Sequence, residues 1–386
     1  SLGNQSFTGK FTPKKIKVKK GLLELIMCSK CNLIQLAHNY DLNYMYGPDY
    51  GYRTGMNKTM TNHVSNVSKS LSNKVNLSKN DIVLDIASND GTLLNSYKKK
   101  SYRFAIDPLV NKYKDNYKKI NFKVSAFFSL NEIVKKTNRK FKIITALAVF
   151  YDLKDPNKFL REIELILEKD GVLFIEVADL LSMLKYNMFD AICHEHLIYY
   201  TSKIILEMTK KNNLRVFDIK FNDINGGSTQ YYICKKNAKY INNDLKLKKV
   251  LKNEKKFKLD EKNTYQKFIL KIKKIRVKIV QLILNAKKRN EKIHGYGAST
   301  KGNVLLQYFN LNKNHIDFIA DRNPKKFNLY TPGTKIKIVS EKFSRKIKPD
   351  YYLVLPWHFK KEILKREQKT IKNGSKFIFP LPFPKV

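Results

Sequence analysis

The sequence of 386 residues predicts an α/β protein built on a doubly wound sheet. Short apolar runs alternate with helical stretches from residue 81 onward, which is the rhythm of strand, crossover and strand. The first run also ends in a turn that contains a glycine and opens a helix, as in nucleotide-binding sheets. A hydrophobic content of 42% favours a globular chain, and the length suffices for two or three domains.

The predicted strands of the first α/β unit are short and bounded by turn residues. They are, in order, DIVLDIA, RFAID (103–107), FKIITAL, GVLFIEV, RVFDIK and TQYYIC. After the first strand, SNDGT predicts a turn and LLNSYKK predicts the start of a helix. Pro156 suits the first turn of a helix over 156–168. Helices between strands imply a parallel sheet.

The segments on either side of this unit differ in composition. Residues 1–60 are rich in Tyr, Gly and Asn and predict a small irregular domain. Apolar residues at helical spacing predict one amphipathic linker helix within 239–291. IHGYGAS then begins a second α/β unit, with strands near 316–320 and 351–355. The predicted domains are 1–60, 61–236, 237–292 and 293–386.

The formal net charge is +43, from 76 basic and 33 acidic residues. Such a balance attracts anionic ligands, and nucleic acid is one candidate. Lysines occur in every segment, however, which favours a compositional bias over a dedicated basic patch. The apolar runs are too short for a membrane span, no signal peptide is visible, and four cysteines do not make a disulfide framework. We therefore expect a cytoplasmic protein without a membrane partner; its oligomeric state stays open.

Four motifs suggest sites for chemistry. DIASNDGTLL (85–94) places a turn at the end of a strand, where backbone N–H groups can meet a ligand. Asp107 ends the next strand, where its carboxylate can accept hydrogen bonds from ribose hydroxyls. An ordinary turn with a helix cap is the alternative. GYGASTKGN (295–303) fails as a Walker motif at Asn303 and as GxGxxG at Thr300, but with Lys301 it can still bind phosphate.

ICHEHLIYY (192–200) holds two of only seven histidines. A zincin would need a histidine four residues after His194, and Ile198 stands there. An HxH metal pair, an acid–base site and a polar loop remain. Cys28 and Cys31 form a CxxC, which is half of a tetrahedral zinc site.

These motifs carry a resemblance. VLDIASNDGTLL resembles the first motif of class I S-adenosylmethionine (SAM) methyltransferases, and more narrowly of the three-domain sugar C-methyltransferases that act on nucleotide-linked deoxysugars. The resemblance spans nearly the whole chain. It continues in CSKCNLIQL, YGPDYGYRTGMNKTMTNH, FDAICHEHLIYY, NDINGGSTQYYI, HGYGASTKGNVLLQY and DRNPKKFNLYTPGTKIKIVS.

The resemblance implies a small zinc-binding N-terminal segment, a class I methyltransferase sheet and a Rossmann-like C-terminal domain. It also implies a reaction: a nucleotide-linked keto sugar loses a proton beside its carbonyl, and the enolate takes the methyl group of SAM. His196 is then the candidate base. Glu195 would orient a histidine or contact the sugar, His194 would be structural, and Tyr151 would supply a phenol.

The implied binding residues form two sets. SAM would contact Asp85, Ala87, Ser88, Asn89, Asp90, Gly91, Asp107, Pro108, Phe127 and Val149. The nucleotide-diphosphate sugar would contact Tyr52, Arg53, Asn225, Gly226, Gly227, Tyr296, Ser299, Lys301 and Asn303. Relatives carry a second CxxC upstream, and SLGNQSFTGKF resembles the segment that follows it, so we expect structural zinc in the intact protein.

Two departures qualify the substrate. Cys193 stands where relatives carry a tyrosine, and Tyr151 stands about where they carry a histidine. A catalytically altered nucleotide-sugar-binding homologue is therefore one alternative. A nucleic-acid methyltransferase is another, but the chain contains no PP for an amino-methylating loop and no PC or TC for a cytosine nucleophile. We expect no nucleic-acid partner.

Overall fold

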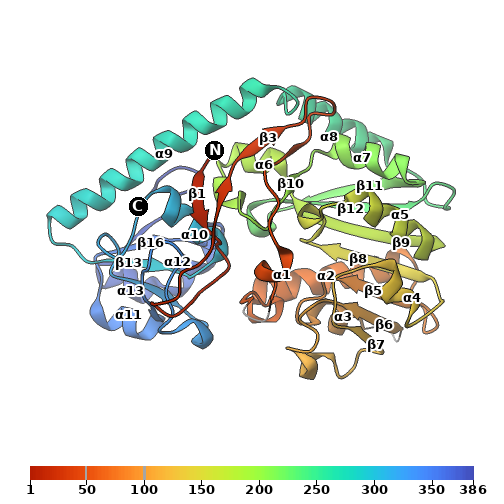
Figure 1. Ribbon diagram of the computed structural model, residues 1–386, viewed down its shortest axis with the longest axis horizontal. Coiled ribbons are helices and arrows are strands. Elements are labelled where there is room, and N and C mark those ends of the chain that lie inside the picture. Colours follow the sequence, from red (N-terminus) through yellow and green to blue (C-terminus); the bar gives the residue numbers. More distant parts are fainter. Residues whose placement is uncertain (48–49, 99–100) are drawn as a thin grey trace. The chain divides into compact units, whose positions relative to one another are not determined.

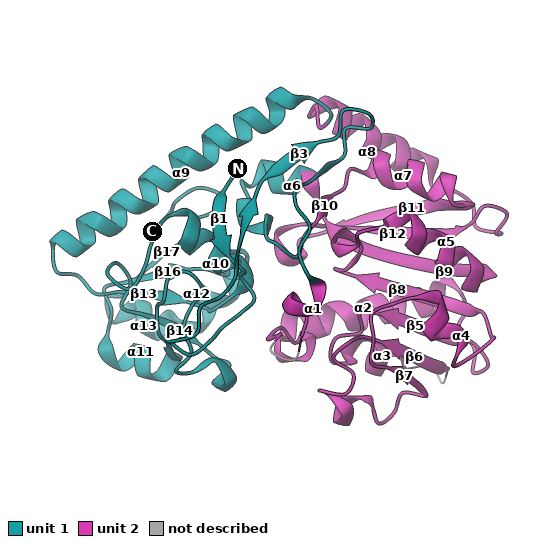
Figure 2. Ribbon diagram, viewed as in Figure 1, with its two compact units in different colours: residues 1–41, 181–196, 260–386 teal, residues 42–180, 197–259 magenta. Residues whose placement is uncertain are grey.

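The computed structural model describes residues 1–47, 50–98 and 101–386 (Figure 1). They form two compact units, each described below by itself (Figure 2). Unit 1 comprises residues 1–41, 181–196 and 260–386, and unit 2 comprises residues 42–180 and 197–259. Residues 48–49 of the Tyr-rich stretch and residues 99–100, the first of which ends LLNSYKK, lie outside the described residues.

In the described residues of unit 2, a seven-stranded sheet has the order β11-β12-β9-β8-β5-β6-β7 (Figure 1). Its strands are β5 (Ile82–Ile86), β6 (Tyr102–Ile106), β7 (Phe122–Val124), β8 (Phe141–Leu147), β9 (Leu167–Ala178), β11 (Leu214–Asn222) and β12 (Ser228–Lys235). β5 pairs in parallel with β6 and β8, as predicted. β12 is antiparallel to both β9 and β11, so the prediction of a wholly parallel sheet is wrong there. The turn 223–227 is too short for a crossover, which needs a dozen or more residues.

The helices of unit 2 are α1 (Leu42–Met45), α2 (Lys58–Lys74), α3 (Thr92–Ser96), α4 (Leu130–Val134), α5 (Pro156–Ile166), α7 (Ser202–Lys211) and α8 (Asp244–Lys256), with the 3-10 turns η1 (Thr54–Met56), η2 (Lys114–Tyr117), η3 (Phe150–Asp152) and η5 (Ile224–Gly226) and the short strand β10 (Ile198–Tyr199). Of these, α3 and α5 begin near the predicted helix starts at LLNSYKK and Pro156. Pro156 lies in the first turn of α5, where the Asp155 side chain accepts from Lys158 N–H, and confirms its predicted place.

The chain reverses its winding direction between β5 and β8. β6 and β7 lie on one side of β5, whereas β8 and β9 lie on the other. In open α/β sheets this point leaves a crevice at the carboxyl ends of the strands, where ligands bind. The predicted SAM loop follows β5 and therefore lies at this crevice.

Unit 1 contains a five-stranded parallel sheet of order β15-β14-β13-β16-β17 in its described residues, which agrees with the predicted second α/β unit. Its C-terminal elements are β13 (Ile293–Tyr296), α10 (Thr300–Tyr308), β14 (Phe318–Asp321), η6 (Pro324–Lys326), β15 (Ile338–Ser340), α11 (Glu341–Ile347), β16 (Tyr351–Val354), η7 (Trp357–Phe359), α12 (Lys360–Arg366), α13 (Gln368–Lys372) and β17 (Lys376–Ile378).

The predicted single linker helix is two helices, and that prediction is corrected. α8 ends before Phe257, and α9 (Lys262–Lys288) begins after Glu261. Lys258 between them has a φ of 55°, a left-handed conformation that a continuous helix cannot contain. α8 belongs to unit 2 and α9 to unit 1. α9 packs through one face, formed by Phe268, Ile272, Ile275, Ile279, Ile283 and Ala286.

Two segments far from the C-terminus in sequence also fold into unit 1. The first forms the hairpins β1 (Gly3–Ser6) with β2 (Lys20–Leu23) and β3 (Leu25–Met27) with β4 (Ile34–Leu36). The Gln307 amide of α10 hydrogen-bonds the N–H and carbonyl of Ser6. The second segment contains most of α6 (Leu180–Lys185) and all of η4 (Phe189–Ala191), and the ring of Phe189 lies 4.9 Å from that of Tyr308. These units therefore divide the chain differently from the predicted boundaries at residues 60 and 236.

No helix within the described ranges is both long and apolar enough to cross a membrane.

Candidate active site

The loop after β5 is held in a strained and fully hydrogen-bonded conformation. Ala87, Asn89 and Gly91 all have left-handed backbones, with φ of 57°, 55° and 74°. Asn89 N–H donates to the Asp107 carboxylate at 2.9 Å, and the Tyr117 hydroxyl donates to the Asn89 carbonyl at 2.9 Å. Such conformations persist only where surrounding contacts over-determine them, and they cluster at ligand sites. The loop is thus preorganised.

Carboxylates gather at this loop although the chain as a whole is strongly basic. Asp85, on β5, accepts from the Thr145 hydroxyl at 2.6 Å. Burial raises the pKa of Asp85 to about 7 and that of Asp107 to about 6, and neighbouring carboxylates add to both shifts. Asp90 is 1% exposed and contributes to the pKa shift of Asp107. A cationic ligand would relieve this repulsion, so the sulfonium and ammonium groups of SAM fit the donor set.

The segment before α2 covers the same loop. Thr54 N–H donates to the Asn89 side chain at 3.0 Å, and Gly55 N–H donates to Asp90 at 3.1 Å. The Asn89 amide in turn donates to the Tyr52 carbonyl at 3.2 Å. Arg53 Nε lies 3.5 Å from the Asp90 carboxylate. Tyr52 and Arg53, predicted as substrate residues, therefore lie against the predicted SAM loop.

Sequence reasoning missed Thr54, Gly55, Tyr117 and Thr145 in this cluster. None of them belongs to the SNDG motif, and Gly55 is 35 residues from its partner Asp90. Tyr117 stands in η2, which no motif marks. Only the folded sheet brings these residues to the loop.

The remaining predicted SAM residues surround the ends of β6, β7 and β8. Pro108 follows Asp107, and its carbonyl accepts from the Ser125 hydroxyl at 3.0 Å. Phe127 lies after β7 with 40% of its surface exposed. Val149 follows β8 and directly precedes η3. The exposed ring of Phe127 at a strand end suits contact with a flat ligand group.

Tyr151 lies in η3, at the carboxyl end of β8. Its carbonyl accepts from Leu197 N–H at 2.9 Å. The adjacent Asp152 accepts from the Tyr46 hydroxyl at 2.7 Å. Burial raises the pKa of Tyr200 well above its usual value, and the negative charge of Asp152 adds to this rise. The structure thus brings Tyr151 to the same edge of the sheet as the SAM loop.

The Gly-Gly turn between β11 and β12 is also strained. Asn225, Gly226 and Gly227 have φ of 54°, 95° and 136°. The Gly227 carbonyl accepts from Asp179 N–H at 3.1 Å, which ties the turn to the end of β9. These predicted substrate residues therefore lie at the carboxyl edge of the unit 2 sheet.

The HEH residues end the middle segment of unit 1. His194 is fully buried, and its Nε2 lies 3.1 Å from the Gly21 carbonyl. Its ring packs 4.5 Å from that of Phe7 and 5.1 Å from that of Tyr40. Burial lowers the pKa of His194 to about 4, so it packs as a neutral ring.

His196 is partly buried and points its Nδ1 at the Ala191 carbonyl, 2.8 Å away. Because a carbonyl only accepts, Nδ1 carries the proton of the neutral ring and Nε2 is the acceptor. Burial, together with the charge of Lys301, lowers the pKa of His196 to about 3. Glu195 is buried beside it and accepts from the Thr8 hydroxyl at 3.4 Å. A Cys193 hydrogen bond partly opposes the rise that burial causes in the Glu195 pKa.

Lys301 is the charged centre of this part of unit 1. Burial raises the pKa of Asp190, and the positive charge of Lys301 partly opposes this rise. Burial and the charge of Lys301 together lower the pKa of His358 to about 3. Asp190 also accepts from the Trp357 indole N–H at 2.9 Å. Lys301 thus stands near two neutral histidines, His196 and His358, where an anion would be attracted.

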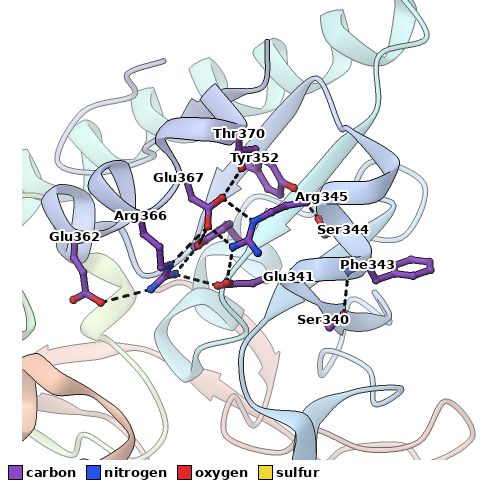
Figure 3. Close-up of polar contacts among 11 residues, drawn as sticks. Ser340, Glu341, Phe343, Ser344, Arg345, Tyr352, Glu362, Arg366, Glu367 and Thr370 are labelled. Atoms are coloured by element: carbon purple, nitrogen blue, oxygen red, sulfur yellow. Dashed lines mark hydrogen bonds and ion pairs between the residues drawn. The ribbon is translucent and has the colours of Figure 1, made fainter. Parts of the chain in front are cut away.

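The other residues of the 295–303 turn are engaged within unit 1. The Tyr296 hydroxyl donates to Glu367 at 2.8 Å, inside an ion-pair network in which Arg345 and Arg366 converge on Glu367 and Glu341 (Figure 3). Ser299 accepts from Gly302 N–H at 3.0 Å and caps α10. The Asn303 amide donates to the Thr8 carbonyl at 2.7 Å. The charge of Lys301 makes it the strongest candidate of the turn for an anionic ligand.

Cys28 and Cys31 lie on the turn between β3 and β4. Asn32 N–H donates to the Cys28 carbonyl, and backbone hydrogen bonds from Cys31 and Lys30 lower the pKa of Cys28. Across the described residues, no third His, Cys, Asp or Glu joins them in a group that could hold a metal. Two thiols do not fill a tetrahedral zinc site, so these residues by themselves do not fit the metal.

Comparisons with known proteins agree with this description. A methyltransferase domain model matches residues 56–219, and a model of the C-methyltransferase C-terminal domain matches residues 223–382. C-methyltransferase NovU of Streptomyces niveus is 27% identical over 367 residues, which cover 94% of this chain and 87% of that protein.

Among solved structures, a SAM-dependent methyltransferase from Clostridium acetobutylicum is 14% identical with a TM-score of 0.37, covering 45% of this chain and 92% of that one. Magnesium protoporphyrin IX methyltransferase from Synechocystis is 10% identical with a TM-score of 0.35, covering 45% and 79%. The two domain matches and the similarity to NovU identify the chain as a SAM-dependent methyltransferase that carries a C-methyltransferase C-terminal domain.

Proposed function

We propose that this C-methyltransferase acts on a nucleotide-linked keto-deoxysugar and methylates the carbon beside its carbonyl. SAM supplies the methyl group as a carbon electrophile on a sulfonium. The preorganised loop 87–91 would hold SAM, with Asp107 as acceptor for its ribose hydroxyls. The sugar assignment rests on the HEHL and Gly-Gly motifs.

The observation that carries the chemistry is the hydrogen bond between His196 Nδ1 and the Ala191 carbonyl, at 2.8 Å. It places the proton of the neutral ring on Nδ1 and makes Nε2 the acceptor, which is the form a general base requires. His196 would take the proton from the sugar carbon, and the C–H electron pair would pass into the enolate. Glu195, anchored by Thr8, would orient the loop.

Lys301 supports an anionic end to the substrate. Its charge lowers the pKa of His196 and of His358, so it disfavours a proton on either ring. A diphosphate bound at Lys301 would offset this charge and make His196 a stronger base. Substrate binding would thus raise the basicity of the residue that acts on it.

The test is incubation with labelled SAM and a panel of nucleotide-linked 4-keto sugars, with products read by mass spectrometry. We expect a product heavier by one methyl group on carbon. His196→Ala should lower kcat roughly 100-fold or more, the range for loss of a general base. His315→Ala is the matched control, because the His315 ring hydrogen-bonds to Asn312, a residue to which the proposed function gives no role.

Methylation of RNA without methylation of any keto sugar would contradict the proposal. An unchanged rate in His196→Ala would contradict the assignment of the base while leaving the substrate class intact.

A further inference from the structure

A histidine–glutamate pair lies inside unit 2, and the proposed function gives it no role. His63, on the second turn of α2, points its Nε2 at the carboxylate of Glu176 on β9 and lies 2.9 Å from each oxygen. The side chains are 10% and 7% exposed. Because both carboxylate oxygens accept, Nε2 carries a proton. A carboxylate that orients an imidazole in this way is the arrangement found in acid–base sites.

Two amides complete the surroundings of Glu176. The Gln230 amide donates to Oε2 at 2.6 Å, and the Asn222 amide donates to it at 3.3 Å. Asn222 also accepts from Ile224 N–H at 2.9 Å, at the start of the Gly-Gly turn. Glu176 therefore links β9 to α2, β11 and β12. Its carboxylate oxygens accept from side chains of these elements, and these hydrogen bonds hold it in place.

The pair lies at the functional edge of the sheet. Glu176 is the register partner of Leu147 on β8, and its carbonyl accepts from Ala148 N–H at 2.9 Å. Val149, a candidate SAM residue, follows directly. Asn222 is the last residue of β11, next to the strained turn 225–227. The pair thus stands between the strand end that carries candidate SAM residues and the turn that carries candidate substrate residues, all within unit 2.

The proposed function assigns a base but leaves open the donor for the charge that develops on the carbonyl oxygen, for which the sequence resemblance offers the Tyr151 phenol. Related enzymes carry a histidine after this strand, where Tyr151 stands here. Enolate formation breaks the C–H bond, sends the proton to the base and moves the carbonyl electron pair onto oxygen. A donor at that oxygen lowers the barrier. When the enolate carbon bonds to the methyl carbon, the C–S bond breaks, its electron pair stays on sulfur and the carbonyl re-forms.

We propose that His63 is this donor and that Glu176 is its positioning residue. Nε2 lies 2.9 Å from each Glu176 oxygen, which is the geometry of an ion pair, and in that pair the imidazolium ring would offer Nδ1–H to the carbonyl oxygen of the acceptor. Among the described residues, Glu176 is the hydrogen-bond partner of the His63 ring, which leaves Nδ1 for the substrate. The inference rests on the proposed function.

The test separates enolate formation from methyl transfer. The full chain is saturated with S-adenosylhomocysteine in D₂O and given the nucleotide-linked 4-keto sugars, and deuterium entry at the carbon beside the carbonyl is followed by mass. We expect His63→Gln and Glu176→Gln each to slow this exchange and kcat roughly 100-fold, in the range for loss of an oxyanion donor. SAM affinity should stay within about twofold, and the double variant should be little slower than either single variant, because residues that act as a unit are non-additive.

A merely structural pair would behave differently. Loss of SAM affinity in step with exchange, together with additive losses in the double variant, would overturn the proposal. So would wild-type exchange in His63→Gln. If that variant does not fold, His63→Asn and Glu176→Gln provide the same comparison. A wild-type chain that binds SAM but neither exchanges nor methylates any keto sugar would overturn the proposed function and with it this inference.

Discussion

The two units contain the same kind of turn, one that we propose as the SAM site and the other filled by the protein. In unit 2 the turn after β5 includes Gly91 at φ 74°, and in unit 1 the turn after β13 includes Gly297 at φ 82°. In each, an aspartate that ends or follows the next strand accepts from the turn. Asp107 accepts from Asn89 N–H at 2.9 Å, and Asp321 accepts from Ala298 N–H at 2.7 Å.

The surroundings of the two turns differ. A side chain at Gly91 would meet its nearest atoms at 3.4 Å, whereas one at Gly297 would lie 2.7 Å from the ring of Pro356. Lys326 donates to the Ala298 carbonyl at 2.7 Å and brings a positive charge to Asp321. Asp107 has carboxylates as neighbours instead. The same backbone geometry therefore yields a filled turn in unit 1 and an anionic loop suited to a cation in unit 2.

The largest expected difference is in stability. Gly297→Ala should lower the free energy of unfolding by about 4 kcal/mol, because left-handed strain and a clash with Pro356 add. Gly91→Ala should cost only about 1 to 2 kcal/mol, since the strain is not accompanied by a clash. Chemical denaturation measures both. Equal losses of unfolding free energy in the two variants would show that the contact with Pro356 does not destabilise a side chain at position 297.

The acidity of the unit 2 loop predicts a pH dependence in the absence of SAM. The pKa of Asp107 rises from 3.8 to about 6, so its contribution to stability is present below pH 4 and is lost as the pH rises through 6. The loss amounts to about 3 kcal/mol, at 1.36 kcal/mol per pKa unit. The asparagine of Asp107→Asn cannot ionise, so this variant does not lose stability through that group. The free energy of unfolding of the variant minus that of the wild type should therefore increase between pH 4 and pH 7. A constant difference between the two curves would contradict the pKa shift.

SAM affinity should distinguish the two aspartates. Asp107→Asn should weaken SAM binding by about tenfold or more, because a hydrogen bond to a charged acceptor contributes roughly 1.5–3 kcal/mol. Asp321→Asn should leave it unchanged, because Asp321 serves the filled turn. Isothermal titration calorimetry measures both constants. An equal loss of SAM affinity in Asp321→Asn would contradict the proposal that SAM binds at the unit 2 turn alone.

The smallest effect is expected at Tyr296. Tyr296→Phe removes a hydroxyl held by Glu367 and Arg366, and it should lower stability by about 1 kcal/mol. The ion pairs of Figure 3 stay in place, so SAM affinity and kcat should not change. A raised KM for the nucleotide-linked sugar would instead show that the phenol contacts substrate, as the sequence resemblance implies.

Local patterns predicted much of the unit 2 sheet. The strands from DIVLDIA to TQYYIC, the SNDG turn and Pro156 of α5 stand where apolar runs, turn residues and caps put them. Asp107 was found because it ends the strand beside the turn. The linker was predicted as one helix because its apolar spacing continues, while the left-handed Lys258 leaves no mark in that spacing.

The sequence by itself determined the class of sheet, the loop that follows β5 and the residues of the HEH motif, because these depend on short-range hydrogen bonding and periodicity. Only the tertiary structure decided their neighbours. It grouped residues 181–196 with unit 1 and joined His63 to Glu176 across 113 residues. Such pairs arise when distant elements pack to bury apolar faces, and buried polar groups must then find partners that no local pattern records.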